Sequence, residues 1–262
     1  MCSQKRQTML AERFVMLGKT VPEQSSDGRM MVCSAGYDME LRTLLRIYPL
    51  AMEDAPRQWS ISSVRLERNP QDSRHESWKL ADERRTTQHH AVNSSFMRHE
   101  HLRIDEPYRL LEHMFVSSIA EANDRRLSLA MIAPVSTPVL NLEWHDDHPD
   151  APQLQLFESH NVLGRKVTDR FPCLPRLRFR DDAGEHNLQL RDWGLFELMR
   201  KRNAYDESLQ PYLAGALKLS ADSCLLVGNL SNQRTVWLVI GVLNMSQQPT
   251  LFDLPTAAMA LT

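Results

Sequence analysis

The chain has 262 residues, of which 42% are hydrophobic and 24% are charged, and its formal net charge is −2. This composition is typical of a globular protein with one large domain or two small ones. It excludes a chain that attracts polyanions as a whole, so any contact with nucleic acid requires a local basic patch.

The cysteines and the apolar runs exclude two further classes of protein. Cys2, Cys33, Cys173 and Cys224 are too far apart to form the close pairs of a zinc knuckle or a redox dithiol. The longest apolar run, residues 236–243, is far shorter than the ~20 residues of a membrane helix. We therefore expect a cytoplasmic protein with reduced thiols, without a membrane association and without a cofactor.

The first 66 residues contain four short apolar stretches that predict β-strands. They cover residues 14–17, 30–37, 44–50 and 59–66, and Pro49 is expected to end the third. Because polar turns separate these strands, they favour a small barrel or a strongly curved sheet over a layered βαβ unit.

The middle of the chain is more polar and more helical. Residues 69–103 are interpreted as loop and surface helix, and a core-supporting helix is expected from Pro107, with Asp105 as its N-cap. A buried strand is expected at residues 127–132, and an acidic stretch at 143–152 is the best candidate for a boundary or an exposed loop. The helical spacing after Pro107 is that of Leu110, Leu111, Met114, Phe115 and Ile119.

The last third of the sequence alternates hairpins with helices. Residues 175–180 and 186–190 predict a hairpin, and Asp192 is suited to cap a helix at residues 193–202. A second helix is expected at residues 205–217, followed by a final hairpin of residues 224–228 and 236–242. The predicted fold class is α+β, with a β-barrel or strongly curved antiparallel sheet under a helical cover. The expected organisation is a β-rich half at 1–142, an α+β half at 143–245, and a tail at 246–262.

Several short motifs resemble those of a family of uncharacterised bacterial proteins associated with mobile elements or genome defence. One strand of that family has the pattern Val-Cys-x-Ala-Gly, as at residues 32–36, and another has Arg-x-Tyr-Pro, as at residues 46–49. A terminal Gln-x-x-Leu-Phe peptide is frequent in the family. The resemblance implies a barrel-containing fold and no established reaction. Further matching motifs are residues 74–79, 128–134, 178–180, 191–193 and 226–229, with Trp237.

A basic segment is the strongest electrostatic feature of the sequence. Between positions 165 and 180 there are six basic residues and one acid. Because side chains alternate along a strand, Arg176, Arg178 and Arg180 should share one face, with a spacing of ~7 Å that suits successive phosphates. A solvated outer face balanced by nearby acids is the alternative. The basic candidates for nucleic-acid contact in this segment are Arg165, Lys166, Arg176, Arg178 and Arg180.

A second candidate surface lies in the N-terminal half of the chain. Arg46 and Tyr48, with Trp59 nearby, would form a stacking surface if they face one groove, as in barrel proteins that bind single strands. The alternative is that these aromatic side chains fill the interior of the barrel.

Two peptides resemble the motif by which bacterial proteins dock on the DNA sliding clamp. Residues 153–157 and 248–252 both carry Gln followed three and four positions later by Leu-Phe. In the second copy, Gln248 would fix the register, and Leu251 and Phe252 would be the apolar anchors. The first copy also reads as a half-buried strand, whereas the second follows the last predicted strand and is expected to be accessible.

The candidates for catalysis form no complete motif. Residues 145–148 (His-Asp-Asp-His) offer ligands for a divalent metal, although four consecutive loop residues seldom converge on one ion. Cys33 is either a nucleophile or a small buried side chain. Asp72, Glu76 and Lys79 are residue types found in nuclease centres, but their spacing matches no defined motif.

The sequence thus favours a non-enzymatic accessory or adaptor protein. Its expected partners are nucleic acid, with DNA favoured, and the DNA sliding clamp, in bacterial genome defence or a mobile element. A metal-dependent nuclease or DNA-modifying enzyme and a structural subunit of a larger complex are the alternatives.

Overall fold

A computed structural model describes residues 7–24, 28–81, 96–102, 107–144, 155–160, 166–170, 173–202 and 208–245. The first seven strands are β1 (Thr8–Lys19), β2 (Glu23–Gln24), β3 (Met30–Asp38), β4 (Thr43–Ala51), β5 (Ser60–Arg68), β6 (Ser77–Leu80) and β7 (Phe96–His101). The next elements are α1 (Pro107–Leu111), a 3-10 turn η1 (Glu112–Met114), β8 (Phe115–Val116), α2 (Ile119–Asp124), β9 (Leu129–Ile132) and β10 (Val139–Trp144). The remaining elements are β11 (Gln155–His160), β12 (Lys166–Arg170), β13 (Cys173–Asp181), β14 (Gly184–Gln189), α3 (Trp193–Arg202), α4 (Leu209–Leu217), β15 (Ser223–Asn229) and β16 (Trp237–Asn244).

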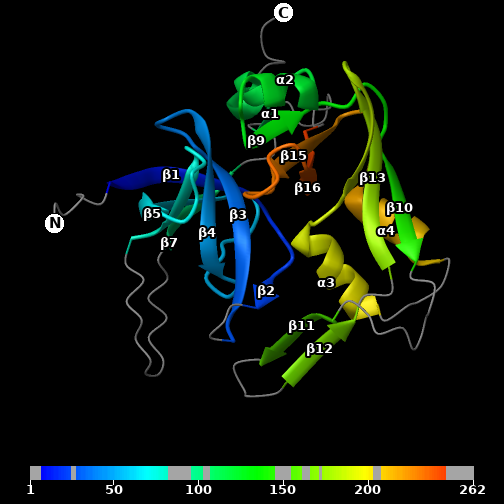
Figure 1. The fold of residues 1–262 in the computed structure, drawn as a ribbon, viewed down its shortest axis with the longest axis horizontal. Helices are drawn as coiled ribbons and strands as arrows, with labels where there is room; N and C mark the ends of the chain where they lie inside the picture. The colour runs from blue at the N-terminus through cyan, green and yellow to red at the C-terminus, as the bar shows by residue number, and fades with distance from the viewer. Residues whose placement is uncertain are drawn as a thin grey trace, which may run out of the picture.

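The first half of the chain forms a closed five-stranded barrel, which Figure 1 shows in blue and cyan. The strand order is β1-β3-β4-β6-β5, and β5 returns to pair with β1. Only the β4–β6 pair is parallel among these five strands. Numbered along the chain, the barrel strands follow the order 1-2-3-5-4 with strands 3 and 5 parallel, which is the order of the OB barrel.

Side chains alternate along the barrel strands, so that every second one fills the interior of the barrel. Phe14, Ile47 and Leu66 point inward and are fully buried, together with the other members of one apolar cluster. The short strand β6 completes the barrel because Trp78 and Leu80 join this same cluster. Two of its four side chains therefore supply the apolar contacts that hold a very short strand in place.

A four-stranded sheet of order β16-β15-β9-β8 packs against the outside of the barrel. Val15, Ala35 and Tyr37 on the barrel contact a shared apolar cluster with Met131 and Leu226 on this sheet. All seven residues of β15 are buried, as expected for a strand covered on both faces. The sheet is thus the middle layer of the molecule (Figure 1).

The third layer consists of the β10-β13-β14 sheet and helices α2, α3 and α4. Its apolar side chains, including Leu177, Phe179 and Phe196, pack on the outer face of the middle sheet through Val227 and Val239. The strands β11 and β12 form a separate antiparallel pair. Figure 1 shows β10 and β13 on the side of the middle sheet away from the barrel.

The fold class expected from the sequence is confirmed, since the protein is mostly β, with a closed barrel and a few short helices. The strands expected at residues 30–37, 59–66 and 127–132 correspond to β3, β5 and β9. The hairpins and the α3 helix of the last third are also present as predicted. The division into units at residues 1–142, 143–245 and 246–262 stays a prediction.

Three local predictions were wrong. Strand β4 does not end at Pro49 but continues to Ala51, because Leu50 and Ala51 still pair with Val32 and Met31 of β3. The polar stretch after Asn69 contains strands β6 and β7 and, among its described residues, no helix. The helix expected from Pro107 stops at Met114, because Phe115 and Val116 pair with β9 and the Ser118 side chain caps a new helix.

Candidate nucleic-acid interface

The site begins on the outer face of β3 and β4, the second and third barrel strands. Cys33, Arg46 and Tyr48 alternate with inward-facing residues and therefore share this face. They line a cavity of about 320 Å³ between the barrel, the middle sheet and the end of β14, here called the β3–β4 cavity. Gln189 and Arg191 line it from the opposite side. Arg46 and Tyr48 thus line one cavity, and their role in binding nucleic acid stays a prediction.

Arg46 is held in place by the middle sheet rather than by a carboxylate. Its side chain is 4% exposed, and Nη2 donates to the Ser128 carbonyl oxygen at 2.6 Å. Nη1 lies 3.5 Å from Cys33 Sγ, and Nε has no acceptor among the described residues. An arginine donor without an acceptor is costly to bury, so a ligand oxygen in the cavity would relieve that cost.

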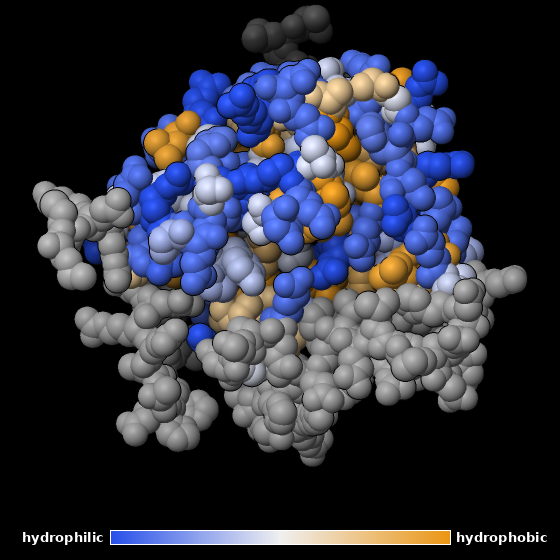
Figure 2. All heavy atoms as spheres, in the orientation of Figure 1, coloured by the Kyte–Doolittle hydropathy of each residue, from blue (hydrophilic) through white to orange (hydrophobic). Residues whose placement is uncertain are grey.

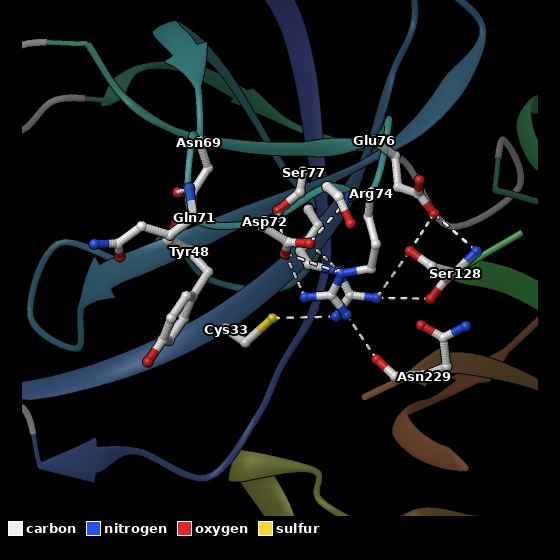
Figure 3. A network of polar contacts seen from close by, with 12 residues as sticks. Cys33, Tyr48, Asn69, Gln71, Asp72, Arg74, Glu76, Ser77, Ser128 and Asn229 are labelled. Atoms are coloured by element: carbon white, nitrogen blue, oxygen red, sulfur yellow. Dashed lines mark hydrogen bonds and ion pairs between the residues drawn. The ribbon is translucent and has the colours of Figure 1, made fainter. Parts of the chain in front are cut away.

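Arg74 anchors the loop before β6 to the end of β15. Its Nη1 donates to the Asn229 carbonyl oxygen at 2.7 Å, and its Nε donates to Asp72 at 2.8 Å (Figure 3). Burial opposes ionisation of Asp72, but hydrogen bonds from Arg74 and Ser77 and the charge of Arg74 lower its pKa to about 2. Asp72 is therefore an ionised partner of Arg74 at neutral pH.

Glu76 extends the same network to the middle sheet. Its Oε1 accepts from the Ser128 backbone N–H at 2.9 Å and from the Ser128 hydroxyl, as Figure 3 shows. Its Oε2 lies 3.0 Å from His75 Nδ1. Arg46, Asp72, Arg74, Glu76, Ser128 and Asn229 form what is called here the polar network. The network joins the barrel to the middle sheet.

The three residues considered for a nuclease centre do not converge in the fold. Asp72 pairs with Arg74, Glu76 bonds Ser128, and Lys79 Nζ lies 2.7 Å from Glu67. Within the described ranges, no three His, Cys, Asp or Glu side chains are placed to hold a metal ion. The His-Asp-Asp-His segment at residues 145–148 lies outside those ranges.

Tyr48 is the aromatic side chain of the β3–β4 cavity. Burial raises the pKa of its phenol, with smaller contributions from Glu23 and Cys33, so the hydroxyl stays neutral. No described residue hydrogen-bonds this hydroxyl, and Figure 3 shows the ring projecting past Cys33, away from the polar network. Trp59 does not join it, because that ring packs against the barrel side of the middle sheet.

Arg74 and Arg191 belong to the cavity but were not identified as site residues from the sequence. Arg191 lies two residues after the end of β14, where it pairs with Glu23 at 3.2 Å. Burial lowers the pKa of its guanidinium, and the charge of Glu23 opposes this. The Arg191-Asp192-Trp193 motif was a visible signal, but only the fold brings it opposite Tyr48.

The basic strand β13 has the predicted alternation. Leu177 and Phe179 are buried, while Arg178 and Arg180 are exposed and Arg176 is half-buried on the outer face. Two acids neutralise part of this face: Arg176 Nε lies 3.1 Å from Glu143, and Arg180 is directly opposite Glu185. Arg165 lies outside the described residues, and only the backbone of Lys166 is described, in β12.

The register between β13 and β14 connects the basic strand with the cavity. Arg176 is directly opposite Gln189, and directly opposite residues point to the same face of a sheet. Because Gln189 lines the β3–β4 cavity, the arginine row of β13 leads toward Arg191 and Tyr48. We name this surface the arginine track, and it consists of Arg180, Arg178, Arg176, Gln189, Arg191, Tyr48 and Arg46.

The face drawn in Figure 2 has a mixed character. Hydrophilic side chains cover much of it, and hydrophobic side chains show among them near its middle. A mixed lining also occurs in the β3–β4 cavity, where Leu230 and Leu238 accompany the arginines. Apolar and cationic groups together suit a ligand with flat rings and charged oxygens.

The two clamp-like peptides have different outcomes. The peptide with Gln248, Leu251 and Phe252 lies outside the described residues, so its docking role stays a prediction. In the first copy, residues 155–157 belong to strand β11, which pairs with β12. The strand interpretation is therefore confirmed for the described part of that copy.

The N-terminal part of the chain is similar to one known protein family. Residues 11–105 match a family model described as "Domain of unknown function (DUF8758)". This range contains most of the barrel and the motifs at residues 32–36, 46–49 and 74–79; the match carries no information on mobile elements, defence or clamp binding. No curated protein matches the chain. Among its described residues, no helix has the length and apolar character needed to span a membrane.

Proposed function

We propose that the protein is an accessory factor that binds single-stranded nucleic acid, DNA in particular, along the arginine track. The observation that carries the proposal is the continuity of β13, through Gln189, with the cavity that holds Arg46, Tyr48 and Arg191. Arginines that follow a strand of phosphates and an aromatic ring for stacking are the two parts of a single-strand binding groove.

The topology of the barrel supports this assignment by analogy. OB barrels bind oligonucleotides on the face of their second and third strands, which correspond here to β3 and β4. Fold alone does not determine function, so the analogy adds only to the arguments from individual residues. Those arguments are that, within the described part of the chain, Arg46 Nε has no acceptor and the Tyr48 hydroxyl forms no hydrogen bond.

The proposal also assigns a place of action. The peptide at residues 248–252 would recruit the protein to the DNA sliding clamp, with Leu251 and Phe252 as anchors. The resemblance of the chain to mobile-element and defence proteins suggests that the protein binds single strands in those processes. The support for this part of the proposal comes from the sequence.

Binding of fluorescent oligonucleotides, followed by anisotropy at several salt concentrations, tests the proposal. Replacing Tyr48 with Ala should weaken single-strand binding about 5- to 100-fold, as expected when one stacked base loses its aromatic partner, while Tyr48→Phe should retain it. Arg191→Gln should reduce the slope of log affinity against log salt by about one. The matched control is Arg125→Gln, which removes an exposed arginine that pairs with Glu121 and does not line the cavity. Equal binding by Tyr48→Ala and the wild type would refute this site.

Cys33 offers a local reporter of the same event. It is partly exposed in the cavity, whereas burial raises the pKa of Cys173 and of Cys224 to about 12 and keeps both thiols unreactive. In a Cys2→Ser background, a bound oligonucleotide should slow alkylation of Cys33 severalfold. Incubation with Mg²⁺ should leave the oligonucleotide uncut. Cleavage would instead favour the nuclease alternative.

A further inference from the structure

A second cavity lies on the other side of the Arg74–Asn229 contact. Its volume is about 420 Å³, and three separate segments line it: residues 73–76 before β6, residues 123–127 at the end of α2, and residues 229–235 between β15 and β16. Arg74 and Asn229 also line the β3–β4 cavity, so the two cavities are neighbours. We name the second one the α2 cavity.

Two arginines of the α2 cavity, Arg126 and Arg234, are exposed and form no ion pair with a described carboxylate. Arg74 is paired with Asp72. Glu76 also lines the cavity: its Oε1 accepts from Ser128, and its buried Oε2 has no hydrogen-bond partner among the described residues, so one carboxylate accompanies the arginines. Arg234 donates only to the Ser73 hydroxyl, at 2.9 Å, among the described residues. Arg126 has no described hydrogen-bond or ion-pair partner for its side chain, and its left-handed backbone, with φ of 55°, is uncommon for a residue other than Gly.

The same cavity also has hydrogen-bonding groups that are fixed but incomplete. The amide nitrogen of Asn229 donates to the Leu127 and Arg234 carbonyls, at 3.3 and 3.0 Å, which determines the orientation of the amide. Its Oδ1 is buried and has no donor among the described residues. Asn123 accepts from Trp237 Nε1 at 2.9 Å, which leaves its amide nitrogen available to donate.

We infer that the α2 cavity binds a terminal nucleotide that carries a phosphomonoester. Such a phosphate has up to two negative charges at neutral pH and three acceptor oxygens, which suits the two arginines Arg126 and Arg234, neither of which has an ion-pair partner among the described residues. A phosphodiester inside a strand has only one charge. The buried acceptor Asn229 Oδ1 has no N–H or O–H donor among the described residues, and a base or a sugar can supply one. A volume of 420 Å³ falls within the range of small-molecule sites.

The inference rests on the proposed function for the source of the nucleotide. A strand bound in the β3–β4 cavity would place its phosphorylated end in the neighbouring α2 cavity, beyond the Arg74–Asn229 contact. A free nucleoside monophosphate has the same chemistry. The experiment therefore includes separate samples for the two sources.

The test compares short single-stranded oligonucleotides of one sequence with a 5′-phosphate, a 3′-phosphate or hydroxyl groups at both ends. One phosphorylated form should bind at least tenfold more tightly than the hydroxyl form. The double variant Arg126→Gln/Arg234→Gln should lose this preference and keep the basal affinity. Arg125→Gln, next to Arg126 but outside the cavity, should keep both, and thermal melting checks that all variants fold.

The possible outcomes separate the inference from the proposed function. Equal affinity for all three oligonucleotides would overturn the inference while leaving strand binding intact. If no oligonucleotide binds, but adenosine or cytidine monophosphate binds the wild type and not the double variant, the cavity stands and the strand-binding proposal fails. Competition by inorganic phosphate as strong as that by the nucleotides would overturn the assignment of a nucleotide.

Discussion

Individual residues connect the barrel to the middle sheet of this protein. Arg46 and Arg74 are buried, and each donates to a backbone carbonyl of the middle sheet, Ser128 and Asn229 respectively. Hydrogen bonds from charged donors are among the stronger ones in proteins, and removing one partner of such a pair is costly. Both arginines are therefore poor targets for testing binding, because their substitution would also loosen the fold.

A close backbone approach at Gly36 predicts a large loss of stability on substitution. A Cβ added there would lie 2.3 Å from the Val15 carbonyl oxygen and 2.3 Å from the Phe14 ring. Gly36→Ala should thus lower the free energy of unfolding by about 3 kcal/mol, as overpacking of a core does. The measurement is urea unfolding.

Gly215 provides the matched control for that substitution. It lies in α4, and an added Cβ would have no heavy atom within 4 Å. Gly215→Ala should raise the free energy of unfolding by about 0.5 to 1 kcal/mol, because alanine favours a helix interior. Equal effects of the two substitutions would contradict the packing described around Gly36.

Asp192 predicts a dependence of stability on pH. Burial raises the pKa of its carboxyl to about 6, although N–H groups of Leu195 and Gly194 and the charge of Lys19 act in the opposite direction. In the unfolded chain the same group titrates near 3.8, so between these values the folded state binds more protons. The contribution of Asp192 to stability therefore falls as the pH rises from about 4 to about 6.

The variant Asp192→Asn removes this titration and keeps a residue that caps helices well. Its stability relative to the wild type should increase across that window, by up to about 3 kcal/mol. Urea unfolding from pH 4 to pH 7.5 measures the difference. Asp182→Asn, in the exposed turn after β13, is the control and should follow the wild-type profile. A constant difference for Asp192→Asn at all pH values would contradict the prediction.

Among the elements, strand β13 combines packing and binding. Its inward residues Leu177 and Phe179 belong to the largest apolar cluster, and its outward arginines lie on the arginine track. One strand thus supports the third layer with one face and presents charge with the other. This separation allows the two roles to be tested independently.

Replacing Arg176, Arg178 and Arg180 together with Gln should weaken nucleic-acid binding without unfolding the protein. The slope of log affinity against log salt should flatten by roughly one for each phosphate that an arginine no longer neutralises. Because Arg176 and Arg180 have acidic neighbours, Arg178 should account for the largest share of this effect. Anisotropy titrations at three salt concentrations measure the slope. Unchanged affinity and slope would remove β13 from the binding surface.

On the scale of the whole molecule, both cavities lie where the layers meet. The β3–β4 cavity is enclosed by residues of the barrel, the middle sheet and the end of β14, and the α2 cavity by three other segments. Sites between packed units are common positions for ligands, because separate segments contribute different side chains. Arg74 and Asn229 of the polar network line both cavities.

The C-terminal peptide predicts a function that is separable from the fold. Replacing Leu251 and Phe252 with Ala should abolish binding to a sliding clamp, since each anchor would contribute about 2 kcal/mol or more. Thermal stability should remain that of the wild type. Met259→Ala, in the same tail but outside the peptide, should retain binding. Early melting of the double variant, or normal clamp binding by it, would disprove recruitment through this peptide.

Local patterns in the sequence were sufficient for several elements. The alternation of Arg176 to Arg180 predicted strand β13 and its two faces, because side chains along a strand point to opposite sides. Asp192 predicted the start of α3, and its Oδ1 accepts from Leu195 N–H at 2.9 Å as a capping residue does. The shared face of Arg46 and Tyr48 follows from the same alternation. Each of these conclusions depends only on neighbours within a few residues.

Other features depended on contacts between distant parts of the chain. Strand β6 has four residues in a polar stretch, and only its position between β4 and β5 makes it part of the barrel. The helix expected after Pro107 was interrupted because Phe115 and Val116 pair with β9. Arg74 and Arg191 meet Tyr48 only after the barrel, the middle sheet and β14 have packed together. The sequence by itself determined which faces are apolar or basic, because that depends on local periodicity. The tertiary structure alone decided which of those faces meet to form a cavity, because that depends on pairings between residues far apart in the chain.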